Sequence, residues 1–138
     1  SFSGRAISIS KTTAPHALSY PFTAHFGINH GHAVSLTFND FLNFNYENIV
    51  YADCNFNLKS RYKILFNLTK TSNINEFDMY IKSLKKKARL ETNFKKLNID
   101  INKSIPLILG GVNLQRLSNN PVRLKITDLK SILKKNNG

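Results

Sequence analysis

Histidine is the residue type in this chain best suited to chemistry, and all four copies lie close together in the sequence. They are His16, His25, His30 and His32. A neutral imidazole nitrogen is a common ligand of zinc and iron, at about 2.1 Å from a zinc ion. On one unbroken helix His16 and His30 would lie about 21 Å apart, at about 1.5 Å of rise per residue. A metal shared by this pair therefore requires the chain to turn back between them.

Such a turn is predicted at residues 27–29, where Gly27 and Asn29 interrupt a helical pattern. A helix that ends before Gly27 and a second helix that begins at His30 would allow the imidazoles of His16 and His30 to meet. The spacing alone leaves two interpretations open. One is a shared metal ion, and the other is two ordinary polar histidines near the edge of a core.

Three further side chains belong to the same short segment. Tyr20 follows His16 by one helical turn and so lies on the same face, where it could line the same cavity. It is a poor general base, because the ordinary pKa of tyrosine is about 10. His25 and His32 fall on roughly the opposite sides of their helices, and we expect them to be ordinary polar side chains. Tyr20 is therefore the candidate catalytic group, and His16 and His30 are the candidate metal ligands.

The elements that must position these residues are predicted to be helices throughout. Apolar residues recur at helical spacing, and the sequence shows neither alternating strand patterns of comparable length nor a glycine-rich phosphate loop. The expected helices cover about residues 8–25, 30–45, 57–68, 76–90, 105–117 and 127–133, with Asn75 and Thr127 as N-caps and with Pro15 and Pro21 bending the first helix. The sequence thus predicts an all-α bundle of about five to seven helices, one domain over residues 1–138.

The formal net charge of +12 suggests an alternative function in nucleic-acid binding. The candidate residues for that alternative are Lys82, Lys85, Lys86, Lys87, Arg89, Lys95 and Lys96. The chain also holds 18 Asn, 15 Lys and 13 Ile, a bias that an A/T-rich coding sequence would produce. The lysine run falls at the end of a predicted helix, where positive charge suits the helix dipole. We therefore expect a solvated helix end and no dedicated nucleic-acid surface.

Other features restrict the cellular setting. Cys54 is the single cysteine, which excludes an internal disulfide and a thiolate zinc site and suits a reducing compartment. The longest apolar stretches, such as residues 105–112, are shorter than the roughly 18 residues of a membrane span. Residues 1–16 show no signal-peptide pattern. We expect a cytoplasmic protein that does not enter a membrane. Because the chain begins at Ser1 and its only methionine is Met79, we expect it to be the downstream part of a longer product.

The run AISISKTTAPHALSYPFTAHFGINHGHAV, residues 6–34, resembles the C-terminal domain of the iron-containing (group III) alcohol dehydrogenases. These enzymes are related in architecture to glycerol dehydrogenase and dehydroquinate synthase. They typically show a histidine on a helix, an aromatic residue or second histidine four residues later, and an HG-x-A-V-like segment whose histidine also binds the metal. His16, Tyr20 and residues 30–34 stand in those places. The run GGVNLQRLSNNPVRLKITDLKSIL, residues 110–133, resembles the end of the same family, and SYPFTAHFGI and VNLQRLSNNP resemble its phosphonoacetaldehyde-reducing branch.

The resemblance implies a helical domain that holds divalent iron, or zinc in some members, through His16 and His30. It implies a separate N-terminal α/β domain as partner, which binds NAD(P)H, and a small alcohol or aldehyde as substrate, in one branch phosphonoacetaldehyde. The metal would act as a Lewis acid during hydride transfer, and Tyr20 could donate a hydrogen bond near the substrate. This sequence lacks that nucleotide-binding domain and the upstream helix with the remaining ligands, so the chain alone is expected to be inactive. A gene remnant without function is the other alternative.

Overall fold

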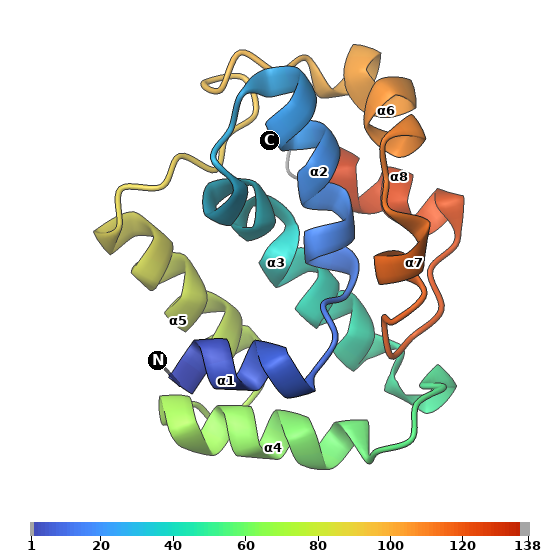
Figure 1. Ribbon diagram of the computed structural model, residues 1–138. Helices are drawn as coiled ribbons and strands as arrows, with labels where there is room; N and C mark the ends of the chain where they lie inside the picture. The colour runs from blue at the N-terminus through green and yellow to red at the C-terminus, as the bar shows by residue number, and fades with distance from the viewer. Residues whose placement is uncertain (1, 136–138) are drawn as a thin grey trace.

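A computed structural model of the chain describes residues 2–135, and these residues form an arrangement of helices (Figure 1). The α-helices are α1 (Phe2–Ile9), α2 (Ala14–Phe26), α3 (His30–Glu47), α4 (Leu58–Thr69), α5 (Ile74–Lys87), α6 (Ile101–Gly110), α7 (Leu114–Leu117) and α8 (Ile126–Lys135), and the 3₁₀ helix η1 (Ile49–Tyr51) follows α3. Within residues 2–135 there is no β-strand, only an isolated antiparallel bridge between Ala52 and Val122. The all-α prediction is confirmed. No helix of this part of the chain combines the length and apolar character that a membrane crossing requires.

Two of the expected helices are each divided in the structure. The segment expected as one helix over residues 8–25 contains the last two residues of α1, the break at residues 10–13 and most of α2. Pro15 lies in the first turn of α2, where a missing N–H group costs no helical hydrogen bond. The segment expected over residues 105–117 forms α6 and α7, because Asn113 begins a new helix by accepting a hydrogen bond from the backbone nitrogen of Arg116 at 2.9 Å.

The two predicted N-caps were also wrong. The side chain of Asn73, and not that of Asn75, caps α5 by accepting a hydrogen bond from the backbone nitrogen of Glu76 at 3.0 Å. Thr127 lies inside α8, and the start of that helix is fixed instead by Asp128, whose carboxylate accepts from the backbone nitrogen of Lys125 at 2.7 Å. Both errors arise because several adjacent polar residues could serve as caps and only backbone geometry selects one.

The centre of the fold is the pair α2 and α3, which lie side by side (Figure 1). Helices α6 and α8 cover them on one side, and α5 packs against α3 on the other. The main buried cluster joins α2, α3, α6, α8 and the segment before α6 through residues such as Leu18, Phe22, Leu36, Phe41, Phe94, Ile101, Ile108 and Leu133. A second cluster joins α4 and α5 to the chain after α7 through Leu58, Tyr62, Phe66, Phe77 and Val122. The helix pair that carries all four histidines is thus held from two sides.

Two contacts fix the position of α7 relative to helices α2 and α3: a close approach of the backbone at Gly111, and hydrogen bonds between two buried asparagine side chains. At Gly111 a β-carbon would lie only 3.0 Å from the β-carbon of Pro21, so glycine permits α2 to approach the end of α6. The buried side chains of Asn45 and Asn120 exchange hydrogen bonds at 3.3 and 2.7 Å, which ties the end of α3 to the turn after α7. Asn120 also donates to the carbonyl of Val122 at 2.7 Å. These contacts position α7 beside α2.

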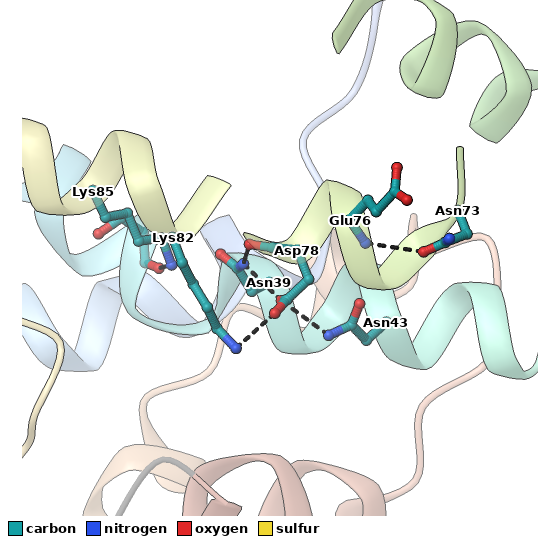
Figure 2. Close-up of polar contacts among 8 residues, drawn as sticks. Asn39, Asn43, Asn73, Glu76, Asp78, Lys82 and Lys85 are labelled. Carbon is teal, nitrogen blue, oxygen red and sulfur yellow. Dashed lines mark hydrogen bonds and ion pairs between the residues drawn. The ribbon is translucent and has the colours of Figure 1, made fainter. Parts of the chain in front are cut away.

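Asp78 on α5 connects that helix to α3 (Figure 2). Its carboxylate accepts hydrogen bonds from Asn39 at 2.8 Å and from Asn43 at 3.1 Å, and it pairs with Lys82 at 2.6 Å. Lys85, one turn further along α5, is half-buried and donates to the backbone carbonyl of Ser35. The expectation of a fully solvated lysine run was therefore wrong at this one position, because its ammonium group holds α5 against α3.

We predict that Asp78→Asn destabilises the fold by about 1–2 kcal/mol at pH 7, since it removes the charge from three hydrogen-bonded contacts. Burial alone would raise the pKa of Asp78, but the hydrogen bonds that it accepts and the charge of Lys82 lower it overall. A lowered folded-state pKa contributes stability that is present above the ordinary value and lost as the pH falls through the folded value. Urea unfolding at pH 7 and at about pH 3 should show a smaller acid dependence in the variant. The exposed Asp53→Asn removes the same charge as a control, and an equal effect there would contradict the prediction.

Candidate functional site

The predicted turn between the two histidine helices is present. Gly27 ends α2 in the left-handed conformation, with φ of 64°, and its backbone nitrogen donates to the carbonyl of Thr23 at 3.2 Å. Glycine adopts this conformation without the steric cost that a β-carbon brings. The buried side chain of Ile28 then fastens the turn to the main core, and α3 begins at His30. The chain therefore returns along α2 as the histidine pair requires.

The turn brings the rings of His16 and His30 together. Their centroids lie 5.6 Å apart, and the ring planes are inclined by 55°. His16 is half-buried, whereas His30 is exposed. Two imidazoles from adjacent helices thus lie side by side at the surface, and a shared ligand would need such proximity.

The side chain of Ser19 contacts both His16 and His30. Its side chain is fully buried, and its hydroxyl donates to the backbone carbonyl of His16 at 2.7 Å. The same oxygen lies 3.3 Å from Nδ1 of His30. Because a serine hydroxyl has one proton and that proton serves His16, the contact with His30 assigns the ring proton to Nδ1. Nε2 of His30 is then the nitrogen whose lone pair is free to bind a ligand.

Tyr20 and Arg116 border the pair on the α7 side. The Tyr20 ring centroid lies 6.0 Å from that of His30, so the tyrosine does share the surface of the two histidines. The guanidinium carbon of Arg116 lies 5.1 Å from the centroid of the Tyr20 ring, and its Nη1 donates to the hydroxyl of Thr12 at 3.1 Å. Arg116 did not emerge as a site residue from the sequence. It lies far along the chain from Tyr20, and no local pattern connects the two.

The electrostatic setting favours a neutral His16. Burial lowers the pKa of His16, and the charges of His30 and Arg116 lower it further. The pKa of His16 therefore lies below the ordinary histidine value, which favours the neutral ring. Neutral imidazole is the form that binds metal ions, since the protonated ring has no free lone pair.

The structure places the other two histidines apart from this pair. His25 is exposed at the end of α2, and its ring centroid lies 6.5 Å from that of Phe26. His32 contacts the backbone carbonyl of Glu91 through Nε2 at 2.6 Å. In residues 2–135 no group of three His, Cys, Asp or Glu side chains is arranged to hold a metal ion. A metal held by His16 and His30 would therefore need further ligands from outside the described residues.

Some of the basic residues considered for nucleic-acid binding form ion pairs or hydrogen bonds with other residues of the chain. Lys82 pairs with Asp78, Lys96 lies 3.7 Å from the carboxylate of Glu91, and Lys85 is bound to the backbone of α3. Lys86, Lys87, Arg89 and Lys95 are exposed. The histidine surface and this basic surface are formed by different elements of the fold.

The fold is an all-α domain with two histidines side by side at a turn between two helices, and comparison with known proteins identifies its family. Residues 1–137 match the model of the Fe-containing alcohol dehydrogenase family, C-terminal. The chain therefore belongs to the iron-containing alcohol dehydrogenase family, and the predicted family is confirmed.

Part of this chain is also similar to a curated reductase. A phosphonoacetaldehyde reductase of Streptomyces viridochromogenes (strain DSM 40736 / JCM 4977 / BCRC 1201 / Tue 494) is 42% identical to this chain over 52 residues. The matched segment covers 38% of this chain and only 13% of that protein. No solved structure shows a significant match.

Proposed function

We propose that this chain is the metal-binding helical part of an iron-type alcohol dehydrogenase, which interconverts an alcohol and an aldehyde with NAD(P)H. The observation that carries the proposal is the pair of imidazole rings of His16 and His30, 5.6 Å apart across the α2–α3 turn. Membership of the family supports it, because the family is named for its iron. The metal is divalent iron, or zinc, and both accept imidazole ligands.

The residues of this chain have distinct tasks in that function. His16 and His30 hold the metal, and Ser19 fixes the His30 ring so that Nε2 remains available. When bound, the metal supplies Lewis acidity that polarises the substrate oxygen. Tyr20 borders the same surface, and its hydroxyl donates a hydrogen bond to the substrate. Arg116 stacks on the Tyr20 ring and limits its movement.

The function needs a partner. Two histidines leave a metal short of the three protein ligands that catalytic sites of this kind have, and residues 2–135 contain helices but no β-strand from which an α/β nucleotide-binding unit could be built. We propose that an N-terminal nucleotide-binding domain and an adjoining helix supply the remaining ligands and the NAD(P)H site, and that residues 1–138 are one domain, inactive alone. The substrate is a small aldehyde, and phosphonoacetaldehyde is the specific candidate because of the reductase relative. The lone, unpaired Cys54 suits a cytoplasmic setting.

The test is a reductase assay on the full-length protein that contains this segment. Oxidation of NADH or NADPH would be followed with phosphonoacetaldehyde and with propionaldehyde, before and after removal of metal by a chelator. We expect the chelator to abolish activity, Fe²⁺ or Zn²⁺ to restore it, and residues 1–138 alone to be inactive. Full activity in a protein shown to be free of metal would reject the proposal.

A further inference from the structure

A polar pocket of about 460 Å³ lies where the chain before α2 meets α7. It is lined by Lys11, Thr12, Gln115, Arg116, Ser118 and Asn119. Each of these side chains carries at least one hydrogen-bond donor, two are positively charged, and none is a carboxylate. A surface with this composition attracts an anion with several acceptor oxygens and offers a cation no ligand of opposite charge.

The walls of this pocket are held in place by contacts within the chain. Asn119 donates to the backbone carbonyl of Thr12 at 3.0 Å, and the Arg116 guanidinium donates to the Thr12 hydroxyl at 3.1 Å. The backbone of Arg116 is fixed by the Asn113 cap at 2.9 Å. The bond to Thr12 uses one of the five N–H donors of the guanidinium, which can therefore also bind an oxyanion. A fixed guanidinium loses less side-chain freedom on binding than a free one would.

Arg116 belongs both to this pocket and to the surroundings of the histidine pair. It lines the pocket, and its guanidinium lies over the Tyr20 ring, which in turn lies 6.0 Å from the ring of His30. The charge of Arg116 also reaches His16, where it is one cause of the lowered pKa. Arg116 thus borders both the pocket and, through Tyr20, the histidine surface.

We propose that this pocket binds the phosphonate group of the substrate, with Arg116 as its principal charged partner and Lys11 as the second. The inference rests on the proposed function, and it makes Arg116 a specificity-determining residue for an anionic aldehyde against an uncharged one. Arginine suits this task because its planar donors match the oxygens of a phosphonate in pairs. The phosphate of a dinucleotide shares this chemistry, so the experiment must separate the two sources.

The experiment compares Arg116→Gln, Arg116→Lys and the wild type in the full-length, metal-loaded protein. We expect Arg116→Gln to raise KM for phosphonoacetaldehyde about 10- to 100-fold, the usual effect of losing a charged hydrogen bond, and to weaken binding of methylphosphonate by a similar factor in calorimetry. KM for NAD(P)H should stay unchanged, and KM for propionaldehyde should rise at least about 10-fold less than KM for phosphonoacetaldehyde, because any effect on the uncharged aldehyde comes only through the contact of Arg116 with Tyr20. Arg116→Lys should recover part of the loss, because lysine keeps the positive charge but lacks the planar, paired N–H donors of arginine. The exposed Arg123→Gln, which removes the same charge outside this pocket, is the matched control.

Three results would overturn the inference. Equal losses with both aldehydes would mean that Arg116 acts only through Tyr20 and His16. A change confined to KM for NAD(P)H would identify a nucleotide phosphate as the ligand. Methylphosphonate affinity that is the same in Arg116→Gln and the wild type would exclude an oxyanion site. Calorimetry with methylphosphonate needs no catalytic turnover, so it tests whether the pocket binds a phosphonate even if the reductase assay shows no activity. The metal content of the protein tests the histidine site separately.

Discussion

The double variant His16→Ala/His30→Ala is expected to lose its bound iron or zinc completely in the full-length protein. The two rings are 5.6 Å apart and are the chain's contribution to the proposed metal site. Any remaining ligands outside this chain would be too few for a stable catalytic site, which needs three protein ligands and an open position. Elemental analysis of desalted protein measures the loss directly, and reductase activity should fall with metal content.

Two further variants test whether the loss is specific to the pair. His25→Ala removes an exposed imidazole from the same helix and should leave the metal content unchanged. Ser19→Ala keeps both rings but removes the oxygen that lies 3.3 Å from Nδ1 of His30, so metal affinity should fall about 10- to 100-fold. The assignment of His16 and His30 as ligands fails if the double variant retains wild-type metal content while its circular dichroism shows an intact fold.

The part of the site that sequence reasoning could predict is the part that depends on local geometry. The interval from His16 to Tyr20 is one helical turn, and Gly27 followed by Asn29 favours a break, so the meeting of His16 and His30 could be predicted from spacing. Helix periodicity likewise predicted an all-α fold, since the amphipathic pattern is repeated in most segments.

What could not be predicted depends on contacts between distant segments. Arg116 reaches Tyr20 only because the Asn45–Asn120 pair and the close approach of Gly111 to Pro21 bring α7 against α2. Lys85 is half-buried because α5 packs on α3. The sequence around it, by contrast, predicts a charged helix end in contact with solvent. Helix limits were missed for a similar reason, since in a chain with 18 Asn many residues can act as caps.

Phe22→Ala is expected to cost about 3–5 kcal/mol in the free energy of unfolding, the largest stability effect that we predict. The side chain of Phe22 is fully buried in the main core. Its ring is stacked on that of Phe94, with centroids 5.6 Å apart and planes inclined by 9°, and it lies 6.2 Å from the ring of Phe26. Alanine would leave a cavity between α2 and the segment that precedes α6, where those contacts cannot be replaced. Urea unfolding measures the change, and Phe2→Ala, which shortens an 87% exposed phenylalanine, should shift stability by less than about 0.5 kcal/mol.

The milder Phe22→Leu separates packing from metal binding. A loss of 3–5 kcal/mol is a large part of the roughly 5–15 kcal/mol that stabilises a typical domain, so Phe22→Ala alone could unfold the protein. Leucine keeps most of the apolar volume and should cost about 1–1.5 kcal/mol. Because Phe22 faces the core and the two histidines meet at the surface, Phe22→Leu should keep its metal while losing stability, and His16→Ala should show the reverse pattern. Metal loss in Phe22→Leu equal to that in His16→Ala would show that core packing, and not the ring pair alone, sets metal affinity.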